Sequence, residues 1–216
     1  MTKLVLIRHG RSTANAAGVL AGRAAVALDE VGRAQAEALR GALAGVTIAA
    51  AYTSPVERCL ETAALAGFPD AAVIEGLSEC DYGDWTGLQL ADLAKEQVWA
   101  DIQATPSAVT FPGGESMAAM FDRVAAAIED LAQRHGDDET IVAFSHGDPI
   151  KAVLAHAFGM ARDDFQRIHV APAGVSVIEY RTPYPMVLCM NVGGELASHL
   201  AAPTAPVVGG GDVAKA

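Results

Sequence analysis

Cysteine is scarce in this 216-residue chain, which has only Cys59, Cys80 and Cys189. An odd number of cysteines without a CxxC pair predicts neither a disulfide framework nor a zinc site. We therefore expect three reduced thiols, placed in or beside the core.

Positive charge is scarce as well. Fifteen Lys and Arg residues stand against 26 Asp and Glu residues, giving a formal net charge of −11. Nucleic-acid binding needs a basic surface, so we expect no nucleic-acid partner. An acidic protein that binds a small anion must gather its few arginines in one cleft. Arg8, Arg23 and Arg58 lie close to the polar motifs described below.

Long apolar runs are absent, because each run is either as short as a strand or broken by charge. A membrane partner is therefore not expected. The first residues lack the charged region, apolar core and cleavage site of a signal peptide, which favours a cytoplasmic location. No clear cluster of metal-ligating side chains is visible either, so we expect neither a metal nor another cofactor.

Short apolar runs alternate with segments of helical period, which predicts an α/β fold with a mostly parallel central sheet and helices on both faces. The length fits one domain, expected over residues 1–200, followed by a disordered Ala-, Pro- and Gly-rich tail over residues 201–216. The expected strands are 3–8, 48–53, 71–75 and 139–145, with a hairpin-like pair at 175–180 and 186–192. The expected helices are 30–44, 55–66, one within 76–104, 116–135 and 148–159.

One of these helices carries a stripe of large apolar side chains at three- and four-residue spacing. Such a stripe on helix 116–135 predicts packing against the core rather than a cofactor site. Its members are Met117, Met120, Phe121, Val124, Ile128 and Leu131.

Two histidines each follow a wholly apolar strand and precede a glycine. His9 stands between Arg8 and Gly10 after the first strand, and His146 stands in Ser145-His146-Gly147 after strand 139–145. Open α/β sheets bind ligands at the carboxyl ends of their strands. We therefore expect one active site built from both ends of the chain. The polar loop after His9, which includes Asn15, adds hydrogen-bond donors for an anion.

A third cation is expected at the same edge. Ser54 and Glu57 have the spacing of a capping box around Pro55, which predicts a helix start there and places Arg58 in its first turn. A guanidinium beside a helix N-terminus suits a phosphate dianion. The alternative is a surface arginine paired with Glu57 or Glu61.

The loop 77–87 combines carboxylates, aromatic rings and glycines. An aromatic wall beside Glu79 would raise the pKa of its carboxyl group by desolvation, as a general acid requires. For Asp81 and Asp84 we prefer turn chemistry and helix capping. Asp148 is expected to be the N-cap of the last helix, with Pro149 as its first residue.

Taken in order, these segments resemble the histidine phosphatase superfamily, also called the phosphoglycerate mutase-like proteins. The resemblance covers about residues 3–180 and is specific because the motifs occur together in family order. They are LIRHGRSTAN at 6–15, GR and LDEVGRAQA within 22–36, TSPVERCLETA at 53–63, LSECDYGDWTG at 77–87, FPGGES at 111–116 and SHG at 145–147.

The resemblance implies a three-layer sandwich and assigns roles to the candidate residues. His9 would take the phosphoryl group and form a phosphohistidine. Glu79 would protonate the leaving oxygen and then activate water. The phosphate pocket would need no metal, and the substrate side of the site would include the GR pair. The pocket residues implied in this way are Arg8, Arg58, His146 and Asn15, with Gly22 and Arg23 beside them.

Three positions depart from the family pattern: Arg11 replaces the usual glutamate, Thr86 a common acidic residue, and Asp148 a frequent glycine. We expect Arg11 and Asp148 to influence which substrates fit. The loop 79–87 looks most like the small phosphatase branch that includes α-ribazole phosphatase.

The segment from Trp85 to Pro112 is short, and Lys95 is its one cation. A mutase must shield its phosphohistidine from water, so we favour a phosphatase acting on a small phosphorylated metabolite. A phosphoglycerate mutase-type phosphomutase is the first alternative. A regulatory or scaffolding protein with vestigial catalysis is a more remote one. The oligomeric state stays open between a monomer and a homodimer.

Overall fold

The computed structural model describes residues 2–136 and 138–193, in which six strands form one sheet in the order β3-β2-β4-β1-β5-β6. β1 pairs in parallel with β4, and β2 in parallel with β4 and β3, whereas β5 is antiparallel to both β1 and β6. The mostly parallel sheet and the closing hairpin are therefore confirmed. The strands are β1 (Lys3–Arg8), β2 (Ala50–Thr53), β3 (Ala72–Val73), β4 (Thr140–Ser145), β5 (Val175–Glu179) and β6 (Met186–Val192).

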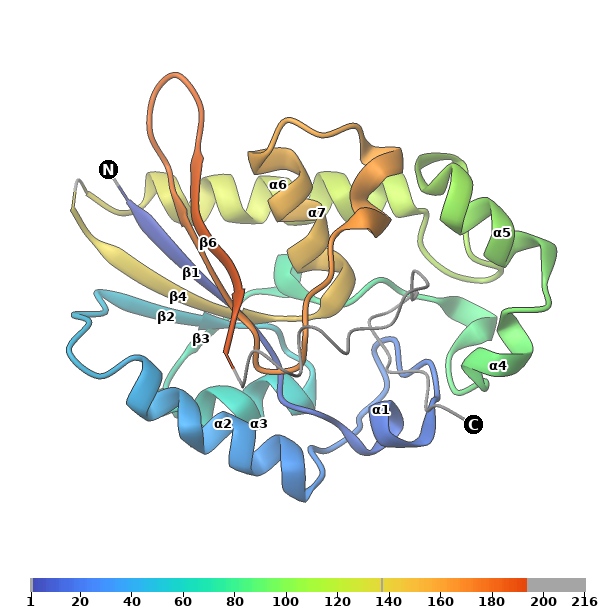
Figure 1. Ribbon diagram of the computed structural model, residues 1–216, viewed down its shortest axis with the longest axis horizontal. Coiled ribbons are helices and arrows are strands. Elements are labelled where there is room, and N and C mark those ends of the chain that lie inside the picture. The colour runs from blue at the N-terminus through green and yellow to red at the C-terminus, as the bar shows by residue number, and fades with distance from the viewer. Residues whose placement is uncertain (1, 137, 194–216) are drawn as a thin grey trace.

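Helices cover both faces of this sheet, as expected (Figure 1). α2 and α3 lie on one face, and α6 and α7 lie on the other. The α-helices are α1 (Thr13–Ala17), α2 (Glu30–Ala42), α3 (Glu57–Leu65), α4 (Leu90–Leu93), α5 (Gln97–Ala104), α6 (Met117–Gln133) and α7 (Gly147–Ala157). Two α-helices, α4 and α5, lie within 76–104, where one was expected, and α1 and the 3-10 helix Arg162–Arg167 were not expected. The tail expected to be disordered, 201–216, lies outside the described residues.

The alternating side chains of β1 explain why the sheet needs helices on both faces. Leu4 and Leu6 belong to a cluster with the α6 and α7 side chains, and Val5 and Ile7 belong to a second cluster on the α2 and α3 side. Burial on both faces follows directly from the apolar interior of this strand, Leu4 to Ile7. The apolar stripe of α6 is buried along its full length, so the prediction that it packs on the core is confirmed.

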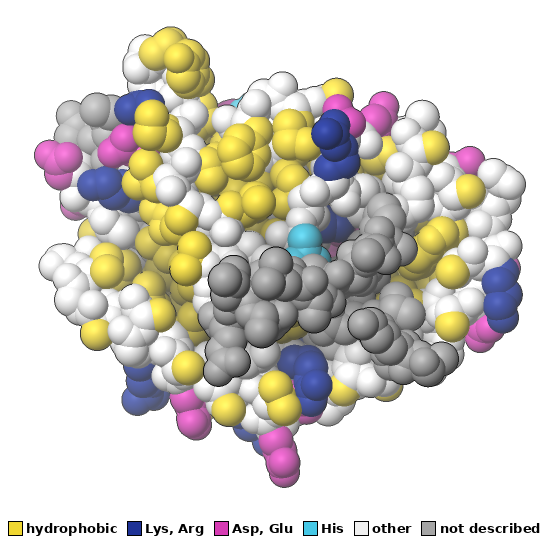
Figure 2. Space-filling model, in the orientation of Figure 1, with side chains coloured by type: hydrophobic (Ala, Val, Ile, Leu, Met, Phe, Trp, Pro, Cys, Tyr) yellow, Lys and Arg dark blue, Asp and Glu magenta, His cyan; other side chains and the backbone are white. Residues whose placement is uncertain are grey.

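The outer strand β6 has a different pattern, because every second side chain is exposed. The exposed members include Leu188, Met190 and Val192, which are 47%, 41% and 53% accessible. Figure 2 shows hydrophobic side chains gathered over the surface that β6 occupies. Cys59 and Cys80 are buried, Cys189 of β6 is partly buried, and all three thiols are free, as expected. No helix in the described ranges is long and apolar enough to cross a membrane.

The loop after β1 is held against α2 by two glycines in backbone contact. A Cβ atom on Gly10 would lie 2.4 Å from the Gly32 carbonyl oxygen, and one on Gly32 would lie 1.9 Å from the Arg11 carbonyl oxygen. Only glycine permits this approach. The position of His9 therefore depends on α2 as well as on its own strand.

This contact predicts opposite effects for two substitutions within α2. Gly32→Ala should destabilise the fold by more than 1 kcal/mol, because its new methyl group meets backbone that cannot move aside. Gly41→Ala meets nothing within 4 Å and should stabilise the protein by about 0.5–1 kcal/mol through helix propensity. Urea unfolding of both variants measures the two changes. Equal stabilities would contradict the close approach.

Candidate active site

Strand register brings the two histidines together. Arg8 of β1 is opposite Ser145 of β4, and the His9 amide donates to the Ser145 carbonyl at 3.0 Å. His9 and His146 therefore follow their strands at the same sheet edge. Their rings are both buried and meet edge to face, with centroids 5.2 Å apart. The structure thus brings together the two histidines that the sequence analysis placed in one site.

Arg58, near the start of α3, reaches both rings. Its Nε donates to His9 Nε2 at 3.0 Å, and its Nη2 donates to His146 Nδ1 at 3.0 Å and to the Gly22 carbonyl at 2.7 Å. The side chain is buried, and Glu61 pairs with Arg33 instead. The alternative of a surface arginine paired with a neighbouring glutamate is therefore wrong.

The capping box predicted for α3 is also wrong. The helix begins at Glu57, and its N-cap Val56 has no side-chain hydrogen bond. The Ser54 hydroxyl instead lies 2.7 Å from His146 Nε2. A buried imidazole nitrogen needs a polar partner more than a helix end does, since water can reach most helix ends but not this ring.

The hydrogen bonds of His9 define its tautomer. Nδ1 lies 2.7 Å from the Gly10 carbonyl oxygen, so Nδ1 carries the proton and Nε2 keeps its lone pair. Burial, with the charges of Arg58 and Arg8, holds the pKa of His9 well below its ordinary value. His9 is therefore a neutral imidazole at physiological pH, which is the form that can act as a nucleophile.

His146 has the opposite tautomer. Because Arg58 donates to Nδ1, the proton is on Nε2 and is donated to Ser54. Burial, and then the charge of Arg58, keep the pKa of His146 well below its usual range. The Cys59 sulfur lies 3.4 Å from Nε2, and burial raises the pKa of this thiol to about 12, so it stays protonated. Ser54 and Cys59 are site residues that the sequence analysis did not identify as such.

Arg8 adds positive charge from the end of β1. Its side chain is 1% exposed, and Nη1 donates to the Val170 carbonyl at 2.7 Å. The guanidinium lowers the pKa of both histidines. A buried arginine at this place creates the positive potential that an anion requires.

Glu79 lines the same cavity as His9 and Arg58. It is buried, and the Cys80 amide donates to its Oε1 at 2.9 Å. Burial first, and then the charge of Asp148, raise its pKa to about 7. A carboxyl group that titrates near neutrality can both give and accept a proton at physiological pH.

The backbone around Glu79 is held by two arginines. Arg23 Nε donates to the Glu79 carbonyl at 2.9 Å, and Arg123 donates to the Ser78 carbonyl at 3.0 Å. Glu115 accepts from both guanidiniums at 2.9 Å. The structure therefore places Arg23 beside the cavity as a support of Glu79. Arg123 and Glu115 were missed; the FPGGES motif contains Glu115, but no local pattern marks Arg123.

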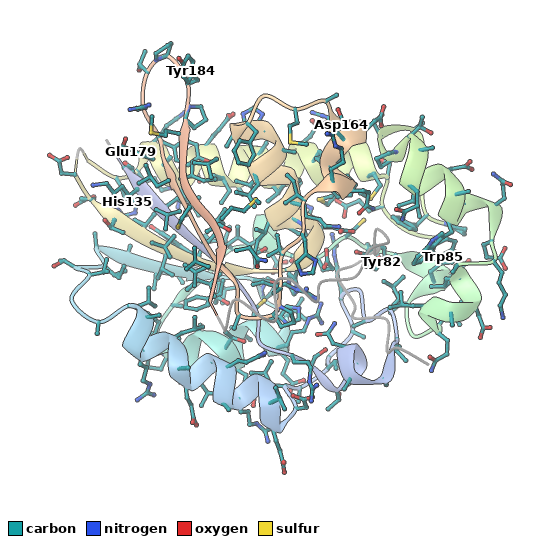
Figure 3. All side chains as sticks on the ribbon, viewed as in Figure 1. Tyr82, Trp85, His135, Asp164, Glu179 and Tyr184 are labelled. Atoms are coloured by element: carbon teal, nitrogen blue, oxygen red, sulfur yellow. The ribbon has the colours of Figure 1, made fainter. Side chains whose placement is uncertain are left out.

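Asp148 is not the N-cap of α7, because that helix begins at Gly147 with His146 as its N-cap. Its buried carboxylate instead accepts from the Tyr82 hydroxyl at 2.8 Å and lies 3.5 Å from Lys151 Nζ. The prediction failed because a buried phenol and ammonium are stronger partners than backbone amides. Figure 3 shows Tyr82 and Trp85 on the side of the sheet near α4.

A small cavity of about 290 Å³, part of it open to solvent, is lined by His9, Arg58 and Glu79, whereas Arg8, His146 and Arg23 are not among its lining residues. Asn15 is held there by a capping box in which its Oδ1 accepts from the Ser12 amide and hydroxyl, which leaves the amide NH2 as a donor. Arg11 does not line the cavity and pairs with Asp29 at 2.6 Å. The lining residues are His9, Asn15, Val19, Leu20, Ala21, Gly22, Arg58, Glu79, Tyr82 and Leu90.

The structure also bears on the expected turn at Asp81 and on the arrangement of metal-ligating side chains. Asp81 makes the predicted turn, since its Oδ1 accepts from the Gly83 amide at 3.0 Å. Within the described part of the chain, no group of three or more His, Cys, Asp or Glu side chains is arranged to hold a metal ion.

The fold and this site define a histidine phosphatase. Residues 4–193 match the histidine phosphatase superfamily (branch 1), and the chain belongs to that superfamily. It is 30% identical over 200 residues to phosphoserine phosphatase 1 of Hydrogenobacter thermophilus, covering 89% of this chain and 93% of that protein. It is 30% identical over 161 residues to a metal-independent phosphoserine phosphatase of Arabidopsis thaliana, covering 71% and 67% of the two chains.

A solved structure has the same architecture. The phosphoserine phosphatase of Entamoeba histolytica in complex with 3-phosphoglyceric acid superposes with a TM-score of 0.81 at 27% identity, covering 89% of this chain and 98% of that one. The expected phosphoglycerate mutase-like fold is therefore confirmed.

The contact between Ser54 and His146 predicts a loss of activity without a matching loss of stability. Ser54→Ala should lower kcat at least about tenfold, because His146 loses the partner that fixes its tautomer. Ser116→Ala is the control, since it removes only the N-cap of α6 and should cost about 1 kcal/mol of stability with kcat unchanged. Steady-state kinetics and urea unfolding separate the two effects. An unchanged kcat in Ser54→Ala would contradict the positioning role.

The pKa of Glu79 predicts the alkaline limb of the pH–rate profile. Phosphoenzyme formation needs the protonated carboxyl, so kcat/KM should fall as pH rises through about 7. Glu79→Gln should slow turnover and remove this limb, whereas the exposed control Glu75→Gln should keep it. The loss in Glu79→Gln should be much larger with an alkyl phosphate than with an electron-poor aryl phosphate, whose leaving group needs little protonation. Equal losses on both substrates would reject the general-acid role.

Proposed function

We propose that this protein is a metal-independent phosphatase that hydrolyses a small phosphomonoester through a phosphohistidine on His9. The observation that carries this proposal is the state of the His9 ring. It is neutral, its Nδ1 proton is held by the Gly10 carbonyl, and its Nε2 lone pair faces the cavity-lining Arg58.

In the first step the phosphate dianion takes the place of the Arg58–His9 hydrogen bond. Arg58 and Arg8 then bind the phosphate oxygens and balance their charge, which is the main requirement of phosphoryl transfer. His9 Nε2 forms a bond to phosphorus as the bond from phosphorus to the ester oxygen breaks. Glu79 gives its proton to that oxygen, so the product leaves as a neutral alcohol.

In the second step water replaces the alcohol. The Glu79 carboxylate takes a proton from this water, whose oxygen bonds to phosphorus while the bond to Nε2 breaks. Free phosphate leaves, and His9 is neutral again. A pKa near 7 suits Glu79 for both directions of proton transfer.

His146 completes the phosphate pocket. It is neutral in the free site, where Arg58 supplies positive charge next to it. Two negative charges on a bound phosphate oppose that effect and favour the imidazolium, which then donates from Nδ1. Asn15 offers its amide NH2, and Gly22 also lines the cavity, which supports the substrate-binding role proposed for both.

Hydrolysis is favoured over the mutase reaction by the segment after Glu79. Its cation Lys95 is 74% exposed and pairs with Asp92 at 2.7 Å. No basic group of this segment is therefore directed at a second anionic group or an acceptor. A vestigial regulatory role is disfavoured because every position needed for the chemistry is filled. The proposal includes one catalytic domain over residues 1–200, located in the cytoplasm.

Trapping the phosphoenzyme tests the proposal. Wild type quenched during turnover of a ³²P-labelled aryl phosphate should carry acid-labile, base-stable label, and His9→Ala should carry none while remaining folded. Activity should survive exhaustive chelation, and 3-phosphoglycerate, where it reacts, should yield mainly free phosphate. Label on His9→Ala would refute the nucleophile. Efficient isomerisation with little phosphate release would favour the mutase.

A further inference from the structure

The cavity has two chemically different ends. Arg58 and His9 form the phosphate end, whereas Val19, Leu20, Ala21 and Leu90 line the remainder. Tyr82 lines the cavity too, but its hydroxyl proton is committed to Asp148. Four of the ten lining residues are therefore aliphatic, beside the polar side chains of Asn15 and Glu79.

This apolar wall is held in place by its backbone. The segment that contains Val19 and Leu20 pairs with the segment that contains Leu90. The Leu20 amide donates to the Leu88 carbonyl at 3.0 Å, and the Leu90 amide donates to the Gly18 carbonyl at 2.9 Å. Such a wall presents the same surface to every substrate instead of rearranging around each one.

The cations near the leaving-group end are held by carboxylates outside the cavity lining. Arg23 and Arg123 share the single carboxylate of Glu115, and Lys151 is buried against Asp148. Among the cavity-lining residues that the structure describes, Arg58 is the one cation, and it belongs to the phosphate end.

Two carboxyl groups lie near this end. Glu79 lines the cavity and is protonated when the ester reacts, and Asp148 lies behind Tyr82 near enough to raise the pKa of Glu79. A carboxylate on the leaving group would lose water against Leu20 and Leu90 without gaining a cation of the cavity lining. An uncharged alkyl leaving group would not have this desolvation cost and would bury apolar surface.

We propose that the leaving alcohol of the natural substrate is uncharged and partly apolar, because Val19, Leu20, Ala21 and Leu90 form the wall that receives it and no described cation is offered there. This proposal rests on the phosphatase function and names the substrate class of that site. It separates this chain from relatives named for phosphoserine, and from the Entamoeba structure that holds 3-phosphoglyceric acid, since both compounds carry a carboxylate.

A matched pair of substrates tests it. n-Butyl phosphate and 4-phosphonooxybutanoate share the same ester carbon and chain length, and differ by a terminal methyl group or carboxylate. The full chain should hydrolyse the butyl ester with a kcat/KM at least about tenfold higher. O-phosphoethanolamine and O-phosphoserine form a second pair, in which removal of the carboxylate should also raise kcat/KM.

Two lysine variants test whether the preference for the butyl ester arises at the aliphatic lining residues. Ala21→Lys puts an ammonium at a half-exposed lining position and should lower the preference for the butyl ester at least about threefold. Ala25→Lys adds the same charge at an exposed position outside the cavity lining and should leave the preference unchanged. High salt should restore the wild-type preference in Ala21→Lys.

Each outcome has a distinct meaning. Equal or better hydrolysis of the carboxylated esters by wild type would overturn the inference and leave the phosphatase function standing. The same preference in Ala21→Lys and wild type would overturn the assignment to this wall. Absence of turnover with every ester, and of label on His9, would refute the phosphatase function itself.

Discussion

A buried guanidinium between two imidazoles is the constraint from which the rest of this site follows. Arg58 is 2% exposed, and its hydrogen bonds go to His9, His146 and the carbonyls of Gly22 and Ala24, none of them anionic. A buried cation is costly unless its donors are satisfied. Both rings must therefore remain neutral acceptors, which gives them their tautomers. No carboxylate of the described residues accepts a hydrogen bond from this guanidinium, which suits the site to a phosphate.

Glu79 differs from the two carboxylates near it in having no cation as a hydrogen-bond partner among the described residues. Asp148 accepts from Tyr82 and pairs with Lys151, and Glu115 pairs with Arg23 and Arg123. Glu79 is left with one amide as its hydrogen-bond donor, which is why burial can raise its pKa. The site thus combines a positive end, where we propose that the phosphate binds, with a carboxyl group that titrates near neutrality and is proposed to protonate the ester oxygen.

Much of this arrangement was predictable from sequence, because strand ends are local features. The two histidines and Arg58 stand at the boundaries of apolar runs, and parallel strands carry such boundaries to one edge. Ser54 and Asp148 were misassigned for a common reason: each has the spacing of a helix cap, and each is used by a buried partner distant in sequence. Arg123 left no local signal, since it acts on a carbonyl 45 residues away. Contacts of this kind become visible only when the fold is known.

The pairing of β1 with β4 and β5 has a consequence for how the protein is made. The first strand to leave the ribosome lies at the centre of the finished sheet, between strands that begin at residues 140 and 175. During synthesis its apolar residues have no neighbouring strand to pair with, and such exposed segments are where aggregation starts. The nascent chain carries His9 long before it carries His146. Partly translated or truncated chains therefore hold His9 without His146, and the two histidines come together only when the closing strands are in place.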